Sequence, residues 1–191
     1  MRIVLAASEV VPFAKTGGLA DVAGALPLAL EELNQEVIVV MPKYKAIQDS
    51  KFNPSTTLRI DGEQSRTIKS QRIKQDIFCS IIGNNIKVYF IENDAYFNRD
   101  GLYGDKSGDY KDNLDRFCYY CKRTLELLKE INFKPDVIHC HDWQSCLIPV
   151  YLKTLYAQEP FYKDTKAVLT IHNIGYQGLF PKEQFPRLGL D

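Results

Sequence analysis

Short apolar runs rich in valine and isoleucine alternate along this chain with segments of helical periodicity. Residues 2–8 and 36–41 are two such runs, and apolar side chains at helical spacing separate them. A continuous apolar run of this length is typical of a strand that is buried on both faces of a parallel sheet. The chain is therefore predicted to begin with a βαβ unit. Pro27 falls inside its helix and predicts a kink there, because proline removes one backbone hydrogen bond.

The same alternation continues through the rest of the sequence. Residues 57–92 are strand-like, and a tight-turn signal at 83–85 predicts an antiparallel hairpin inserted before a core strand at Val88–Ile91. A second helix is expected from Asn113 to Ile131 and another begins near Asp142, with strands at "PDVIHC" and "KAVLTIH". Strands that alternate with helices predict an α/β fold with a doubly wound, mainly parallel, Rossmann-like sheet.

The charge and cysteine content exclude several classes of protein. There are 24 basic and 24 acidic side chains, so no overall field favours nucleic acid or an anionic membrane surface. No segment approaches the roughly 20 apolar residues that span a bilayer, and the N-terminus lacks a signal-peptide pattern. The five cysteines are dispersed and odd in number, so we expect reduced thiols, with Cys118 and Cys121 packed on an apolar helix face. A cytoplasmic protein without nucleic-acid or membrane partners is predicted.

Polar residues follow three of the predicted strands. In an open sheet of this kind, ligands bind outside the carboxyl ends of the parallel strands. The first strand runs into Glu9 and the "KTGG" turn, "PDVIHC" runs into "HDW", and "AVLTI" runs into "HNIGYQG". All three histidines of the chain, His139, His141 and His172, lie at two of these strand ends. We therefore expect one polar site along this edge of the sheet.

The turn that contains Lys15, Gly17 and Gly18 has the composition of an anion-binding loop. Its lysine precedes the glycines, so it matches neither the P-loop nor the dinucleotide fingerprint. The glycines would let a ligand approach bare N–H groups at a helix N-terminus, and the lysine would add a positive charge. The alternative is an ordinary strand-to-helix turn that needs glycine for its dihedral angles and carries a solvated lysine. The two interpretations remain open at this point.

The other two strand ends also have alternatives. Asp142 is a candidate N-cap for the helix that follows it, or a carboxylate that faces the site; the two roles are compatible. Trp143 is expected to pack in the protein rather than stack on a ligand. His139, His141 and His172 could hold a metal ion together with Asp142, although His139 lies deeper in its strand. The polar groups between glycines in "HNIGYQGLF" suit a hydroxyl-rich ligand such as a sugar.

Five motifs in order give the chain a family resemblance. "SEVVPFAKTGGLADVAGALP", "VMPKY", "NRDGLYG", "PDVIHCHDW" and "HNIGYQGLFP" closely resemble the N-terminal half of bacterial glycogen synthases and plant starch synthases. The resemblance implies an α-1,4-glucosyltransferase that moves glucose from ADP-glucose or UDP-glucose to the non-reducing end of a glucan, with retention and without metal or cofactor. It also implies a GT-B fold in which residues 1–191 are the first Rossmann-like domain. The nucleotide-binding second domain would be missing, so we expect this piece alone to be inactive.

The resemblance also assigns roles to individual residues. Lys15, Gly17 and Gly18 would contact the donor diphosphate, with Glu9 and Asp21 beside them. His172 would lie against the donor glucose, where its ring and carbonyl can bind a hydroxyl group and stabilise an oxocarbenium-like centre. Asn173 and Asp142 would line the glucose and acceptor side, and Tyr176 would lie on the acceptor side. Phe97 would stack on the acceptor sugar. It belongs to the turn-rich segment 96–110, which is expected to be a surface loop.

Two functions of other classes compete with this one. The domain could be a stand-alone glucan-binding module, because most of the acceptor side would lie on this half. It could also be a metal-dependent hydrolase built on His139, His141 and His172. Retention itself is open between departure of the diphosphate from the face that is attacked and a covalent intermediate on a carboxylate.

Overall fold

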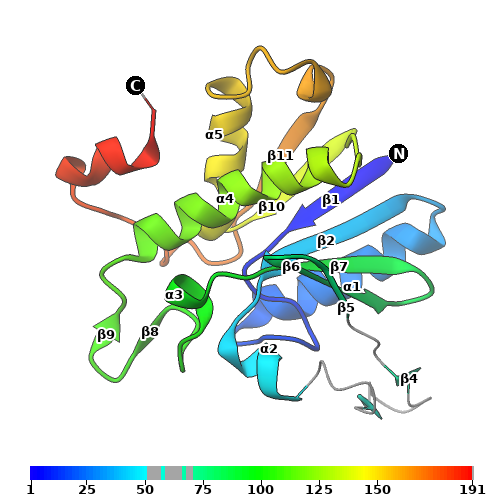
Figure 1. Ribbon diagram of the computed structural model, residues 1–191, viewed down its shortest axis with the longest axis horizontal. Helices are drawn as coiled ribbons and strands as arrows, with labels where there is room; N and C mark the ends of the chain where they lie inside the picture. The colour runs from blue at the N-terminus through cyan, green and yellow to red at the C-terminus, as the bar shows by residue number, and fades with distance from the viewer. Residues whose placement is uncertain (51–56, 59–65, 68–70, 191) are drawn as a thin grey trace.

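The computed structural model describes residues 1–50, 57–58, 66–67 and 71–190. Its centre is a seven-stranded sheet in the order β11-β10-β1-β2-β7-β6-β5, with α1 on one face and α4 and α5 on the other (Figure 1). The pairs between β11, β10, β1, β2 and β7 are parallel, whereas β5, β6 and β7 pair antiparallel. This arrangement confirms the prediction of a doubly wound, mainly parallel sheet with an inserted hairpin.

The elements have the following bounds. The strands are β1 Arg2–Ala6, β2 Glu36–Pro42, β3 Thr57–Leu58, β4 Arg66–Thr67, β5 Gln71–Lys74, β6 Ile77–Ile82, β7 Ile86–Ile91, β8 Gly104–Asp105, β9 Gly108–Asp109, β10 Val137–His141 and β11 Lys166–Thr170. The α-helices are α1 Gly18–Glu32, α2 Lys45–Ser50, α3 Asp94–Phe97, α4 Asn113–Glu130 and α5 Leu147–Lys153. The 3₁₀ turns are η1 Trp143–Ser145, η2 Pro160–Tyr162 and η3 Lys182–Leu188. Much of the strand-like segment predicted at 57–70 lies outside the described residues.

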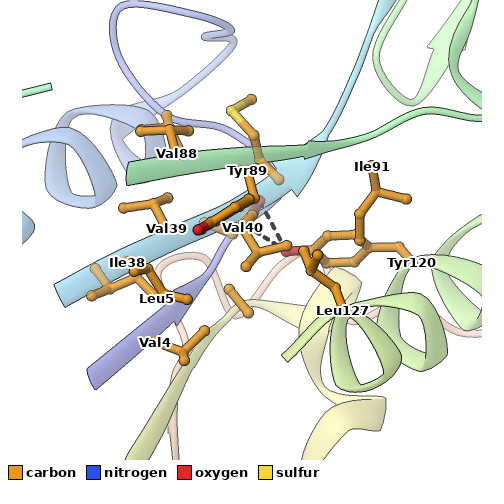
Figure 2. Packing of buried hydrophobic residues seen from close by; sticks show 14 of the residues in the cluster. Val4, Leu5, Ile38, Val39, Val40, Val88, Tyr89, Ile91, Tyr120 and Leu127 are labelled. Atoms are coloured by element: carbon orange, nitrogen blue, oxygen red, sulfur yellow. Dashed lines mark hydrogen bonds between the residues drawn. The ribbon is translucent and has the colours of Figure 1, made fainter. Parts of the chain in front are cut away.

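The core lies between the central strands and α4. Val4 of β1, Val39 of β2 and Val88 of β7 are fully buried, as expected of strands that are covered on both faces (Figure 2). Tyr120 of α4 reaches across the sheet, and its hydroxyl group donates a hydrogen bond of 2.8 Å to the carbonyl oxygen of Val40. This bond ties the long helix to the middle of the sheet and satisfies a polar group that is completely buried.

The inserted hairpin is fixed to α1 through its turn. Gly83 has φ +60°, where a Cβ atom would meet the Leu28 side chain at 2.7 Å. The backbone N–H groups of Asn84 and Asn85 donate to the Glu31 carboxylate at 3.1 and 2.9 Å. The turn predicted at 83–85 is therefore confirmed, and it is held by the carboxylate of Glu31 in the last turn of α1.

The two cysteines of α4 and the proline of α1 were also singled out in the sequence. Cys118 and Cys121 are buried on α4, which confirms the packing role, and burial raises the pKa of both thiols. Pro27 lies inside α1 as expected, whereas the kink itself stays a prediction. No helix in the described part of the chain is both long enough and apolar enough to cross a membrane.

The turn-rich segment 96–110 is not the simple surface loop that was predicted. It carries the small β8–β9 hairpin, and it closes over Arg116, whose side chain is completely buried. The guanidinium group donates to the carbonyl oxygens of Tyr96 and Leu102 at 2.7 and 2.9 Å and to the Asn113 side chain at 2.6 Å. Because a buried cation needs such partners, these bonds hold the segment against α4.

The strand β11 forms one margin of the sheet. It pairs with β10 on one side, and its residues are exposed along most of the strand. Val168 and Leu169 point to opposite faces and are 47% and 43% exposed, although such side chains are usually buried. The loop that carries His172 begins directly after this strand.

Candidate functional site

The three histidines gather at the carboxyl ends of β10 and β11, as the sequence predicted. The rings of His139 and His141 stack with centroids 4.2 Å apart, and those of His141 and His172 stack at 5.2 Å. The two strands are parallel neighbours, and β10 in turn pairs with β1, which runs into the Glu9 and Lys15 segment. The predicted polar residues therefore lie along one edge of the sheet.

His141 is the central member of this stack. It is completely buried, and its Nδ1 lies 2.9 Å from Nε2 of His172. Burial, with smaller contributions from the neighbouring His139 and His172, lowers the pKa of His141 to about 3. His139 is half-buried and its Nε2 lies 2.7 Å from the Thr170 hydroxyl group, and burial lowers its pKa as well. His141 is therefore neutral at physiological pH and serves as a hydrogen-bonding partner of His172.

Asp142 holds the backbone of His172. Its carboxylate accepts a hydrogen bond of 2.6 Å from the His172 N–H group, and its own N–H group donates to the Thr170 carbonyl oxygen at 2.9 Å. Asp142 stands at the N-cap position of η1, as one of its two compatible interpretations predicted, but its side chain makes no capping bond there. The carboxylate turns to the His172 backbone instead. The physical reason is its backbone conformation, φ +58° and ψ −176°, which turns the carboxylate toward the neighbouring strand end.

Trp143 packs beneath the loop that follows His172. Its ring meets Phe117 edge-on with centroids 4.9 Å apart, and Phe180 at 5.7 Å. Gly178 has φ +63°, and a Cβ atom there would come within 2.5 Å of the Trp143 ring. The packing role predicted for Trp143 is confirmed, and the second glycine of "GYQG" is explained by this close approach.

Asn173 and Tyr176 lie at the surface of the same loop. The Asn173 side-chain oxygen accepts a hydrogen bond of 2.9 Å from the Gly175 N–H group, which closes a tight turn. The Tyr176 ring is 71% exposed. Both residues are therefore accessible from solvent, whereas His172 between them and the sheet is half-buried.

The Lys15 loop has an exposed cation and open glycine backbone. The Lys15 ammonium group pairs with both oxygens of Asp21 at 2.6 and 2.8 Å, and both side chains are about half exposed. Gly17 and Gly18 are exposed, and no described atom lies within 4 Å of a Cβ built on either. Gly17 has φ −145°, which other residues also adopt, so the local dihedral angle does not require glycine there.

Glu9 lies underneath this loop and binds it. Its carboxylate is nearly buried, at 3% exposure of the residue, and accepts hydrogen bonds from the Thr16 N–H group, the Thr16 hydroxyl group at 2.6 Å and the Gly17 N–H group at 3.2 Å. The Tyr103 hydroxyl group adds a bond of 2.7 Å, and it also pairs with Ser8. Glu9 therefore fixes the shape of the loop, and one of the predicted anion-binding N–H groups is already engaged.

The described residues contain no group of three His, Cys, Asp or Glu side chains arranged to hold a metal ion. His141 and His172 direct one ring nitrogen each at the other. The three rings are stacked, and one hydrogen bond within the stack joins His141 to His172.

Comparison with known proteins adds an independent observation. The family model described as "Starch synthase catalytic domain" matches residues 2–191. The chain belongs to the starch synthase catalytic domain family. It is 46% identical to the glycogen synthase of Syntrophotalea carbinolica over 191 residues and 48% identical to that of Koribacter versatilis over 194 residues. All of this chain is aligned in both cases, and it spans 39% and 38% of the length of these relatives.

A solved structure supports the same family. The catalytic domain of starch synthase IV from Arabidopsis thaliana, bound to ADP and acarbose, matches all of this chain with a TM-score of 0.76 and 30% sequence identity. The match covers 37% of that chain. The mainly parallel seven-stranded sheet described above is therefore the sheet of a starch synthase catalytic domain, as the motifs indicated.

Within this starch synthase family domain, Phe97 does not have the position that was expected of it. Its side chain is completely buried and lies edge-on to Tyr44, with ring centroids 5.8 Å apart and an interplanar angle of 86°. The Asn93 side chain caps α3 at the Tyr96 N–H group, and this short helix turns Phe97 into the core. The predicted stacking of Phe97 on an acceptor sugar is therefore wrong for this structure, because no face of the ring is open.

Sequence reasoning missed two contributors to the site of this starch synthase family domain. Tyr103 lies in "NRDGLYG", a motif of the family resemblance to which no site role was assigned, yet its hydroxyl group binds Glu9 across 94 residues of sequence. Thr16 lies between the lysine and the glycines, and its hydroxyl group binds the same carboxylate. A polar side chain between the lysine and the glycines of the turn was the available signal for Thr16, whereas no sequence pattern pairs Tyr103 with Glu9.

Proposed function

We propose that this chain is part of an enzyme that transfers glucose from ADP-glucose or UDP-glucose to the non-reducing end of an α-1,4-glucan, with retention. The observation that carries the proposal is the Lys15 loop, where a cation and open glycine backbone at the start of α1 share a sheet edge with His172. The relatives are named glycogen synthases, and the starch synthase IV catalytic domain was solved with ADP and acarbose. The ADP in that relative supports ADP-glucose as the donor.

Lys15 is proposed to exchange partners when the donor binds. It is paired with Asp21, but a diphosphate carries more negative charge than one carboxylate and also attracts the first N–H groups of α1. An exposed ion pair is worth only about 0–1 kcal/mol, so its loss costs little. In the transition state, Lys15 and the Gly18 N–H group would stabilise the charge that develops on the leaving diphosphate. No metal or cofactor takes part in this proposal.

The histidine loop is proposed to bind the donor glucose. Asp142 and His141 fix the backbone and the ring of His172, and Asn173 and Tyr176 lie beyond it on the exposed side where a glucan acceptor would approach. The three carboxylates of this edge already have partners: Glu9 binds the lysine loop, Asp21 binds Lys15 and Asp142 binds His172. This engagement supports departure and attack on the same face rather than a covalent intermediate on a carboxylate.

The chain spans 39% of the length of its glycogen synthase relative, so the proposed activity needs more protein than these 191 residues. The decisive experiment measures incorporation of labelled glucose from ADP-glucose into glycogen. The chain alone should show none. A chimera in which residues 1–191 replace the matching segment of the Syntrophotalea carbinolica enzyme should be active, and UDP-glucose in parallel reactions defines the donor.

Lys15→Ala in the chimera should lower the rate at least a hundredfold, the usual cost of one group that stabilises transition-state charge. Lys134→Ala is the matched control, because Lys134 is also an exposed lysine with one carboxylate partner, Asp164 at 3.5 Å. It should leave the rate unchanged. A folded chimera without transfer activity, or equal rates for both variants, would refute the proposal.

A stand-alone glucan-binding role is the second candidate, and the exposed Tyr176 ring favours it. Calorimetric titration of the chain with maltooligosaccharides separates the two. Binding that is lost in Tyr176→Ala and retained in Lys15→Ala would support the glucan-binding role for the isolated chain.

A further inference from the structure

The hydrogen bond between His141 and His172 determines which nitrogen of His172 can carry a proton. Nδ1 of His141 and Nε2 of His172 are 2.9 Å apart, which is a hydrogen-bond distance. In a neutral pair, one ring donates and the other accepts, and each ring then has its second nitrogen in a defined state. Two arrangements are possible, and they differ at Nε2 of His141.

The surroundings of His141 distinguish these arrangements. Its Nε2 is buried and has no hydrogen-bond partner among the described residues. If His172 donated, His141 would carry its proton on Nε2, and a buried N–H group would have no acceptor. If His141 donates, Nε2 is a bare lone pair. Orphaned buried N–H groups are rarer in proteins than under-satisfied acceptors, so the second arrangement is favoured.

We infer that His141 donates from Nδ1 to Nε2 of His172 and thereby fixes His172 as the neutral tautomer that carries its proton on Nδ1. His141 is a positioning residue in this arrangement, since it acts through His172. The Asp142 carboxylate holds the His172 backbone N–H group at 2.6 Å, so the ring and the main chain are both fixed before any ligand arrives. His139 completes the stack but directs its Nε2 to Thr170 instead.

The consequence is that His172 offers a hydrogen-bond donor to a ligand. The ring is half-buried, and none of the described residues is hydrogen-bonded to its Nδ1. A ligand oxygen, such as a sugar hydroxyl group used as an acceptor, would be recognised by this N–H group. This statement about sugar rests on the proposed function, whereas the tautomer assignment rests only on the geometry of the chain itself.

Long-range ¹H–¹⁵N NMR on the ¹⁵N-labelled chain tests the tautomer directly. The chain has three histidines, so single variants assign every ring. At about pH 8, above the usual histidine pKa, His172 should show a protonated Nδ1 and an unprotonated Nε2. A wild-type spectrum in which His172 is protonated on Nε2 would overturn the inference, and this measurement needs no substitution at His141.

Three variants then identify His141 as the cause. In His141→Phe, the stacked ring remains but the donor is lost, so His172 should shift toward the Nε2–H form that unconstrained histidine prefers. In His141→Asn, a side-chain amide stands where Nδ1 was and can donate, so the wild-type tautomer should return. His139→Gln is the control and should leave His172 unchanged. An unaltered His172 spectrum in His141→Phe would refute the positioning role.

A binding measurement separates this inference from the proposed function. In the active chimera, His141→Phe should raise KM for the sugar nucleotide about tenfold, and His141→Asn should restore most of the loss. If wild type has the assigned tautomer but neither chain nor chimera binds a nucleotide sugar, the proposed function fails while the tautomer assignment stands. If KM is unchanged in His141→Phe although the tautomer shifts, the donor role of His172 toward the sugar is refuted.

Discussion

Glu9 offers the sharpest test of how the Lys15 loop is held. Its two carboxylate oxygens accept four hydrogen bonds, two from backbone N–H groups of Thr16 and Gly17 and two from hydroxyl groups. In Glu9→Gln, the remaining oxygen can still accept from the two N–H groups, and the hydroxyl groups can rotate to accept from the new amide. What is lost is the charge on the acceptor. Hydrogen bonds to a charged group are about twice as strong as neutral ones, so each N–H bond should weaken by about 1 kcal/mol.

The free energy of unfolding should therefore fall by about 2 kcal/mol in Glu9→Gln, which corresponds to a decrease in Tm of about 4–8 °C for a chain of this size. Urea denaturation followed by fluorescence and circular dichroism measures it. Glu31→Gln is the matched control, because this carboxylate also accepts from two backbone N–H groups, those of Asn84 and Asn85, but at an exposed site. Its cost should stay below about 0.5 kcal/mol. Equal losses in both variants would refute the argument that burial strengthens the Glu9 network.

Three further predictions concern the packing and the titration of the site. Gly178→Ala should lower the free energy of unfolding by about 2 kcal/mol, because the new Cβ atom would combine a positive φ with a contact at 2.5 Å to Trp143. Fluorescence of Trp143, the only tryptophan of the sequence, measures the unfolding. Gly17→Ala is the control and should leave the free energy of unfolding unchanged. Arg116→Met should cost about 3 kcal/mol in urea denaturation, since one buried and two part-buried hydrogen-bond acceptors lose their donor. His141 has its folded pKa, about 3, below the unfolded value of about 6.5, so its contribution is complete above pH 6.5 and is lost as pH falls. Stability should drop by up to about 2 kcal/mol between pH 6.5 and 5, and His141→Phe should flatten that slope; a slope equal to wild type would contradict the assignment.

The sheet could be predicted from the sequence because parallel strands that are buried on both faces are continuous apolar runs rich in valine and isoleucine. Every residue after Glu36 in the run at 36–41 is apolar and buried, and the strand occupies Glu36–Pro42. The clustering of the histidines was also predictable, because the carboxyl ends of adjacent parallel strands meet at one edge. The chain order alone did not show that β1 and β10 are neighbours, because 134 residues separate paired positions such as Ile3 and Val137.

The positions of the Phe97 ring and the Asp142 carboxylate could not be predicted from the sequence. Phe97 was assigned to the surface because turn-forming residues surround it, but the buried cation of Arg116 draws that segment over the core. Asp142 had two compatible interpretations, as an N-cap and as a carboxylate that faces the site. It stands at the N-cap position of η1, but its positive φ turns the carboxylate to His172. Both outcomes depend on contacts between residues far apart in sequence, which neither composition nor periodicity reports.

Strand addition at the exposed edge strand β11 would affect the segment that carries His172. Among the described residues, no strand pairs with the outer side of β11, and the free backbone groups of an edge strand accept a further strand readily. Val168 and Leu169 add apolar surface to both faces of β11. His172 follows β11 after a single residue, so any chain that pairs there stiffens the segment on which His172 is mounted. Self-association of the isolated chain through this margin would therefore change its affinity for ligands, and titrations of the isolated chain should be repeated over a range of protein concentrations.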